Sequence, residues 1–223
     1  MTTIALTLDA NGAQTPLNIT LTQGVIAGWT GRDPVARDHH IKELQELGIA
    51  PPATTPIYYR CSARRFTTDG MIECTDVNSS GEVEFCLIAS GGKTYVGVGS
   101  DHTDREVESY GVAISKQMCE KPIAAEFWPY EDVRSHWDRL TLRSWVDGDV
   151  LYQEGTLGAL LHPDSLMERT EPPLVNGTLM FCGTFAAIGG IRPARTFRYE
   201  LMDPVLHRAI SGRYEMRVLP VIS

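Results

Sequence analysis

Alternating apolar and polar residues, interrupted by glycine-containing turns, recur along most of this chain. Residues 3–8 and 17–21 alternate in this way, and Asn11-Gly12 between them is typical of a two-residue hairpin turn. Ser90-Gly91-Gly92-Lys93 predicts a second hairpin, and Val175-Asn176-Gly177 predicts another turn. Because side chains in a strand alternate between its two faces, this pattern favours a mainly β protein.

Helical periodicity is limited to a few segments. Asp33 and Pro34 are the residue types preferred at a helix N-cap and first turn, and Gly48 is placed to end that helix. Apolar residues follow Pro34 at approximately helical spacing, namely Val35, Ile41, Leu44 and Leu47. Further helices are predicted over 131–142 and 165–169. The sequence therefore indicates a mainly β fold with some α-helix.

Length and charge narrow the functional classes. A chain of 223 residues fits one compact unit, in which residues 1–50 are an N-terminal subregion and residues 51–223 the main body. A formal charge of -8 argues against nucleic acid or an anionic membrane surface as a partner. The sequence contains no apolar run of ~18 residues that would indicate a transmembrane helix.

The cysteines and the N-terminus bear on location. The five cysteines are odd in number and show no Cys-x-x-Cys spacing, which suits reduced thiols. The segment Met1–Ala5 lacks the basic region of a secretory signal. We therefore expect a cytoplasmic protein.

Three acidic residues are predicted to converge beside the second hairpin. Glu82 and Glu84 point to the same face of a strand. If Gly91 and Gly92 form the turn, Glu82 lies opposite Asp101, with Cβ atoms roughly 5 Å apart. Like charges this close need a partner, and oxygen ligands without a His or Cys cluster favour Mg²⁺ or Mn²⁺. A solvated acidic strand face remains the alternative.

Several motifs then occur in a recognisable order. Glu82-Val83-Glu84 is followed by Ser100-Asp101-His102-Thr103-Asp104-Arg105-Glu106 and by Ser115-Lys116-Gln117-Met118. Gln153-Glu154-Gly155-Thr156 and Cys182-Gly183-Thr184-Phe185-Ala186 come later, and Pro56-Ile57-Tyr58-Tyr59-Arg60 precedes them. In this order, over roughly residues 25–190, the sequence resembles the fumarylacetoacetate hydrolase superfamily. The resemblance implies a mixed β-roll with a few peripheral helices, commonly in a homodimer.

The sequence also departs from that family's pattern. The connection between Glu84 and Asp101 is short, and Arg60 replaces a lysine. Ser115 replaces a glycine, and Phe185 replaces a proline. Residues 28–33 stand where the family has an Asn-Tyr entry to its lid. Metal binding by Glu82, Glu84 and Asp101 is expected to survive these changes, whereas the substrate stays open.

Candidate catalytic residues are His40, Glu43 and Lys116. His40 and Glu43 are three residues apart on the predicted helix, so they can hydrogen-bond, and a carboxylate raises the basicity of an imidazole. The resemblance gives such a pair on a lid helix the role of general base. An exposed polar helix face is the alternative. Lys116 would stabilise developing negative charge near the metal.

Candidate substrate-binding residues are Arg60, Arg105, Gly183 and Thr184. Arg105 would bind either the substrate or the carboxylate cluster. The Gly183-Thr184 turn would offer N–H groups and a hydroxyl to a substrate carboxylate, or would simply end a strand. His102 is predicted to point away from the metal, because it is next to Asp101 in an extended segment.

Together these features predict an Mg²⁺- or Mn²⁺-dependent hydrolase. It would cleave a carbon–carbon bond in a small diketo or 2-oxo acid through a metal-bound enolate. Decarboxylation, dehydration and tautomerisation of 2-oxo acids pass through the same enolate, so a decarboxylase, dehydratase or tautomerase is the first alternative. A small-acid binding module without catalysis is the second.

Overall fold

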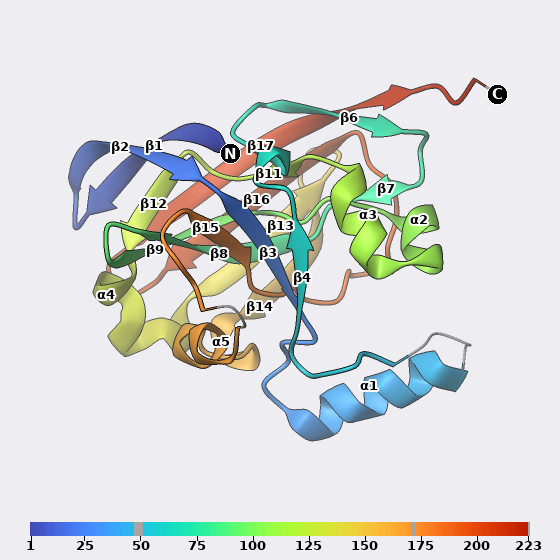
Figure 1. Cartoon of the computed structure of the whole chain (residues 1–223), viewed down its shortest axis with the longest axis horizontal. Coiled ribbons are helices and arrows are strands. Elements are labelled where there is room, and N and C mark those ends of the chain that lie inside the picture. Colours follow the sequence, from blue (N-terminus) through green and yellow to red (C-terminus); the bar gives the residue numbers. More distant parts are fainter. Residues whose placement is uncertain (47–50, 171–172, 223) are drawn as a thin grey trace.

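Two sheets of unequal size form the body of the molecule (Figure 1). The structure, a computed structural model, describes residues 1–46, 51–170 and 173–222, without the side chains of His40, Glu43, Leu44 and Glu46. The larger sheet has eight strands in the order β2 (Ala13–Leu21), β1 (Thr2–Ala10), β12 (Glu126–Pro129), β9 (Lys93–Ser100), β8 (Val83–Ser90), β15 (Thr178–Phe181), β3 (Gln23–Gly28) and β4 (Ile57–Cys61).

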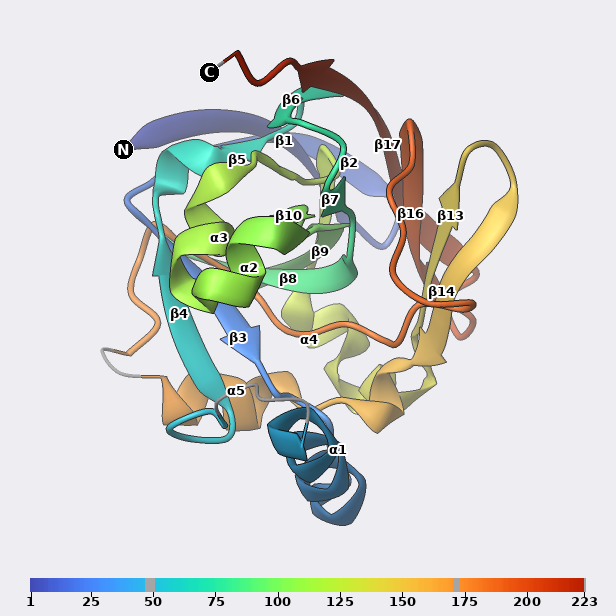
Figure 2. The ribbon, with the colours of Figure 1, turned by 90° about the vertical axis from the view of Figure 1, so that its right-hand side faces the viewer.

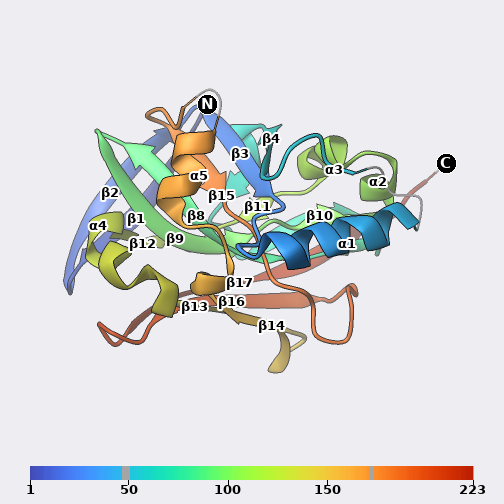
Figure 3. The ribbon, with the colours of Figure 1, turned by 90° about the horizontal axis from the view of Figure 1, so that it is seen from below.

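The second sheet has five strands and lies against one face of the first (Figure 3). Its order is β14 (Val150–Thr156), β13 (Thr141–Val146), β16 (Thr196–Asp203), β17 (Arg208–Leu219) and β6 (Met71–Thr75). Two short strand pairs complete the sheets, β7 (Ser79–Ser80) with β10 (Thr103–Asp104) and β5 (Phe66–Thr67) with β11 (Lys121–Pro122). This architecture confirms the predicted mainly β roll.

Helices lie at the periphery. They are α1 (Pro34–Glu46), α2 (Arg105–Tyr110), α3 (Val112–Met118), α4 (Tyr130–Val133) and α5 (Pro163–Arg169), with short 3-10 turns at Ala63–Arg65, Arg134–Arg139 and Leu157–Ala159. Helices α2 and α3 pack together beside β7 and β10, whereas α1 stands apart from both sheets (Figure 2). Within the described residues, no helix is long and apolar enough to cross a membrane.

Strand β8 is buried on both of its faces. Phe85 and Leu87 on one face belong to the core between the two sheets. Cys86 and Ile88 on the other face belong to a second core, enclosed by the curl of the larger sheet. The strand therefore occupies the centre of the molecule, and whatever it presents at its start is held rigidly.

Both predicted hairpins are confirmed. Strands β1 and β2 pair around Asn11 and Gly12, and Ser90 pairs with Lys93 around Gly91 and Gly92. Both glycines have positive φ, +59° and +73°, which is the conformation that a tight two-residue hairpin turn requires.

The structure confirms the start of the first predicted helix and contradicts part of the second. Helix α1 begins at Pro34 as expected, with Asp33 Oδ1 accepting from the Val35 and Ala36 N–H groups at 2.8 and 3.3 Å. Its expected end at Gly48 lies outside the described residues. The predicted helix over 131–142 is wrong beyond Arg139, because α4 gives way to a 3-10 turn and then to β13. The alternating burial of residues 141–146 explains this, since a strand buries every second residue.

Candidate metal centre

The β8–β9 ladder brings the three predicted acidic residues together. Val83 pairs with Ser100, and the Asp101 N–H donates to the Glu82 carbonyl at 3.0 Å, so the hairpin register continues to these two residues. One carboxylate oxygen from each of Glu82, Glu84 and Asp101 lies within 4.8 Å of the other two. Glu84 and Asp101 are buried, and Glu82 is half-buried.

Two lysines hold Asp101. Lys116 Nζ lies 2.6 Å from Oδ2, and Lys121 Nζ lies 2.7 Å from Oδ1. Burial acts to raise the pKa of Asp101, but the two ammonium groups outweigh it and hold that pKa well below its ordinary value. Asp101 is therefore ionised, and its charge is balanced from both sides.

Arg105 connects Glu82 to a further acid, Glu108. Its guanidinium lies 3.2 Å from Glu82 Oε1 and 2.7 Å from Glu108 Oε2, and its Nε donates to Ser80 Oγ at 2.7 Å. Lys116 Nζ lies 3.7 Å from Glu82 and 3.6 Å from Glu108. Of the two roles that the sequence leaves open for Arg105, these contacts correspond to holding the carboxylate cluster.

Glu84 differs from the other acids because no ion pair to it occurs among the described residues. Its Oε2 accepts the Gly183 N–H at 2.7 Å. Burial, together with the charges of Asp101 and Glu82, raises the pKa of Glu84 well above its ordinary value. Positive charge is thus short on this side of the cluster. Three carboxylates around a charge-deficient point fit a hard divalent cation such as Mg²⁺ or Mn²⁺.

The turn after β15 supports Glu84. Gly183 has φ of +106°, and a Cβ there would collide with the Thr30 hydroxyl, so only glycine fits. The Thr184 hydroxyl donates to the Val83 carbonyl at 2.8 Å and accepts from Gln153 Nε2 at 2.7 Å. The sequence suggests Gly183 and Thr184 as substrate ligands. In the structure, the Gly183 N–H and the Thr184 hydroxyl instead donate to Glu84 and to the Val83 carbonyl.

The structure gives less information on the other predicted site residues, Arg60, His40 and Glu43. Arg60 lies in β4, and its carbonyl accepts from Gln117 Nε2 at 3.1 Å, which ties that strand to α3 beside Lys116. His40 and Glu43 lie in α1, but their side chains are outside the described part of the structure, so the predicted dyad stays a prediction.

Sequence reasoning missed Lys121 and Glu108. Glu108 is three residues after Arg105 in α2, and that spacing is a readable signal for an ion pair on one helix face. Lys121 gives no such signal. Lys121 lies in the two-residue strand β11, which pairs with β5, and the bridge between Gly99 and Ile123 brings it beside the segment that carries Asp101.

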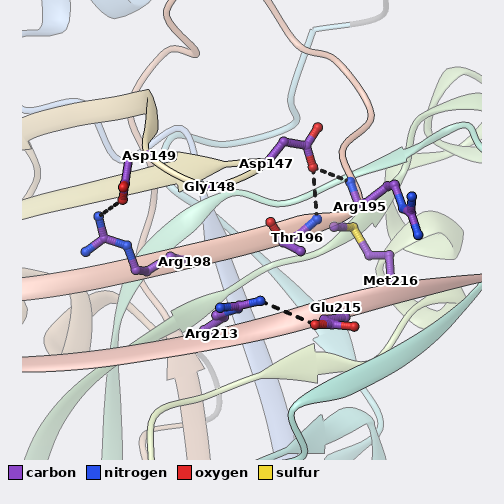
Figure 4. A pocket seen from close by; sticks show the side chains of 9 residues that line it. All are labelled: Asp147, Gly148, Asp149, Arg195, Thr196, Arg198, Arg213, Glu215 and Met216. Carbon is purple, nitrogen blue, oxygen red and sulfur yellow. Dashed lines mark hydrogen bonds and ion pairs between the residues drawn. The ribbon is translucent and has the colours of Figure 1, made fainter.

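A surface groove of about 590 Å³ lies elsewhere, on the five-stranded sheet (Figure 4). Its charged side chains largely pair with one another. Arg198 lies 3.1 Å from Asp149, and Arg213 lies 3.3 Å from Glu215. None of the three acids of the candidate centre lines this groove.

Solved structures share this fold. A fumarylacetoacetate isomerase/hydrolase-type protein from Oleispira antarctica superposes with a TM-score of 0.64 at 16% identity, covering 94% of this chain and 99% of its own. Maleylpyruvate hydrolase from Sphingobium sp. SYK-6 gives 0.60 at 12% identity, over 92% and 77%. The 4-oxalocrotonate decarboxylase from Pseudomonas putida G7, complexed with magnesium and adipate, gives 0.56 at 17%, over 88% and 77%.

These likenesses confirm the resemblance drawn from the motifs, because the chain has the fold of the fumarylacetoacetate hydrolase superfamily. Its own family is narrower. Residues 27–214 match the family described as "Protein of unknown function (DUF2848)", and the chain belongs to that family. No curated protein matches the sequence significantly.

Proposed function

We propose that the protein is a divalent-metal-dependent hydrolase that cleaves a carbon–carbon bond in a small diketo or 2-oxo acid. The observation that supports this most is the convergence of Glu82, Glu84 and Asp101 within 4.8 Å, with Glu84 buried and short of positive charge. Hydrolases and a decarboxylase of this fold support the reaction class.

Glu82, Glu84 and Asp101 would hold Mg²⁺ or Mn²⁺. When bound, the cation supplies a Lewis acid that stabilises negative charge developing on the 2-oxo group of the substrate. Gly183 orients Glu84 through its N–H, and Lys121 orients Asp101. These two contacts fix the ligands before the cation arrives, which lowers the cost of binding.

The other residues would act on the substrate. Lys116, next to the carboxylates and buried, would donate hydrogen bonds to an oxygen that gains charge. Arg60 is proposed to pair with a substrate carboxylate, as a guanidinium does well. His40, oriented by Glu43, would take a proton from water as that water attacks the second carbonyl of a diketo acid. The carbon–carbon bond then breaks, and the electron pair passes to the 2-oxo fragment.

Thermal unfolding of chelator-treated protein tests the metal centre. We expect Mg²⁺ or Mn²⁺ to raise the melting temperature, and oxalate to raise it further only with the cation, because ligands that bind the folded state stabilise it. Glu84→Gln removes a ligand charge while keeping the volume and the Gly183 contact, so both rises should vanish. Glu131→Gln, at a side chain that is 76% exposed, is the matched control.

The outcomes separate the possible functions. Turnover of a diketo acid that is lost in Glu84→Gln and in His40→Ala supports the hydrolase. Turnover that needs Glu84 and Lys116 but not His40 identifies a decarboxylase, dehydratase or tautomerase instead. Tight oxalate binding without turnover of any 2-oxo acid identifies a binding module. No shift with Mg²⁺ or Mn²⁺ would refute the metal centre.

We also propose that the protein is a homodimer, as the family resemblance implies. Exposed apolar side chains near the C-terminal strand, among them Val218, Val221 and Ile222, supply surface that a second subunit would cover. Sedimentation equilibrium tests this, and a mass of 24.6 kDa, that of one chain, would contradict it.

A further inference from the structure

A second group of metal-binding residue types lies outside the acidic cluster. Cys74 is in β6, His102 lies between β9 and β10, and Cys119 follows α3. Their two Sγ atoms and a ring nitrogen all lie within 4.8 Å of one another, and all three residues are buried. Figure 2 shows β10 and α3 at the same end of the molecule. Elements far apart in the sequence thus bring these donors to one point.

Hydrogen bonds fix the imidazole with one edge toward a thiol. Ser79 Oγ lies 2.9 Å from Nε2 of His102, and Tyr214 Oη lies 2.9 Å from Nδ1. Ser79 also hydrogen-bonds Cys74, so the Nε2 edge faces that thiol. Tyr214 is the kind of outer partner that holds a metal-binding imidazole through its other nitrogen, whereas Ser79 now occupies Nε2 and would have to turn away to free that nitrogen for a cation.

The two thiols also interact with each other. The hydrogen bond from Cys119 lowers the pKa of the Cys74 thiol, and His102 adds to that effect against the opposing effect of burial. The same hydrogen bond raises the pKa of Cys119. Metal binding would deprotonate both thiols, because the thiolate is the form of cysteine that binds metals.

We propose that Cys74, His102 and Cys119 bind a borderline divalent cation, in the first place Zn²⁺. Sulfur and nitrogen donors favour Zn²⁺ over Mg²⁺. Zinc–thiolate and zinc–imidazole bonds of about 2.3 and 2.0 Å place ligand atoms roughly 3.5 Å apart, so small side-chain shifts would close the cluster. Two thiolates neutralise the ion, which suits a buried site. Ser79 Oγ would exchange its hydrogen bond to His102 Nε2 for the place of the fourth donor.

The proposed thiol site is connected to the acidic cluster but does not depend on the proposed function. Tyr214 Oη, which holds His102, also lies 2.9 Å from Ser100 Oγ, and that oxygen accepts the Glu82 N–H at 3.2 Å. His102 directly follows Asp101 in the chain. A cation at the thiol site would therefore tie β6 and the end of α3 to the segment that carries Asp101 and, through Tyr214 and Ser100, to the segment that carries Glu82.

Cobalt and zinc titrations of the whole chain test the proposal. Protein purified under reducing conditions and stripped with a chelator should bind one equivalent of Co²⁺ with thiolate-to-cobalt charge-transfer absorption, and Zn²⁺ should displace it. Cys74→Ser and Cys119→Ser should each weaken binding at least 100-fold. Cys61→Ser changes another buried thiol outside the cluster and should bind as the unmodified chain does.

Other outcomes would overturn the proposal. Folded, reduced protein without charge-transfer absorption contradicts it, and so does a Cys74–Cys119 disulfide that persists after reduction and excludes the ion. If the cysteine variants fail to fold, the effect of Zn²⁺ on the melting temperature of the unmodified chain and of Glu84→Gln tests the proposal instead. Zn²⁺ should raise the melting temperature of both equally. A rise that is lost in Glu84→Gln would place the ion at the acidic cluster instead.

Discussion

At the scale of single residues, the candidate centre contains a competition between a lysine and a cation. Lys116 Nζ lies 2.6 Å from Asp101 and 3.7 Å from Glu82, two of the three carboxylates that would bind the metal. The ammonium group stabilises the cluster without metal, and it repels any divalent cation that enters. The same ammonium group would attract an anionic ligand bound to that cation.

Lys116→Met should therefore change cation and anion binding in opposite directions. We expect it to tighten Mg²⁺ or Mn²⁺ binding about tenfold, ~1.4 kcal/mol, because a nearby positive charge is removed. The additional stabilisation by oxalate should fall. Isothermal titration of the cation, with and without oxalate, measures both effects. Weaker cation binding in Lys116→Met would show that this lysine supports the metal ligands rather than competing with the metal.

Lys121 has a different role, because it is fully buried and bonds only within the protein among its described contacts. Its Nζ lies 2.7 Å from Asp101 and donates to the His102 carbonyl. Lys121→Met leaves part of a buried charge unbalanced and should lower the free energy of unfolding by about 3 kcal/mol. Lys93→Met, at the exposed hairpin turn, should change it by less than about 0.5 kcal/mol. Urea unfolding compares the two, and equal stabilities would contradict this role.

The convergence of the acids could be predicted from the sequence, whereas the contact of Lys121 with Asp101 could not. A two-residue turn fixes the register of a hairpin, so the pairing of Glu82 with Asp101 follows from counting outward from Gly91 and Gly92. Lys121 reaches Asp101 because residues 121–123 pair both with β5 and with the end of β9, and no local pattern encodes pairings between segments that are not adjacent in the chain.

At the scale of elements, the turn between β16 and β17 depends on one buried carboxylate. Asp203 accepts from His136 Nε2 at 3.0 Å and from the N–H groups of Val205 and Leu206 at 2.9 and 3.1 Å. Burial acts to raise its pKa, but these hydrogen bonds outweigh burial and lower the pKa of Asp203. The ionised carboxylate thus closes the hairpin and ties it to the 3-10 turn that contains His136.

The lowered pKa of Asp203 predicts a pH dependence of stability. An acid whose folded pKa lies below its unfolded value of about 3.9 stabilises the fold above that value, and the effect is lost as pH falls through the folded pKa. Asp203→Asn should cost about 2 kcal/mol at pH 7 and flatten the loss of stability below about pH 4. Unfolding free energies between pH 3 and about pH 7 measure this. Asp149→Asn, at a side chain that is 93% exposed, is the control and should lose stability at low pH as the unmodified protein does.

Caps and turns in the sequence correctly predicted the helix and the hairpins that contain them. The prediction was wrong where the secondary structure of a segment depends on its neighbours in a sheet. The Asp33 cap and the glycine turns carry their own geometry, so α1 and the hairpins appear as expected. Residues 141–146 carry no cap or turn, and their place between β14 and β16 makes them a strand.

At the scale of the whole molecule, neighbouring residues of β8 have different roles, one in the candidate metal centre and the other in the hydrophobic core. Glu84 faces the acidic cluster, whereas Phe85 faces the core between the sheets, where its ring meets the Trp137 ring edge-on at 5.0 Å. Both positions are set by the pairing of β8 with β9 and β15. A cavity on the Phe85 side should leave that pairing, and so the cluster, in place.

Phe85→Ala should therefore weaken the fold and spare the metal centre. Loss of a fully buried phenylalanine costs about 3–5 kcal/mol, and Phe85 is 0% exposed. We expect cation affinity to change by less than about twofold (about 0.4 kcal/mol) while the variant is folded, since no ligand touches the cavity. Denaturant unfolding and cation titration at a low temperature measure the two quantities, with Val77→Ala, 55% exposed, as the control. A folded Phe85→Ala variant that no longer binds the cation would show that core packing, and not the strand ladder alone, sets the positions of the three acids.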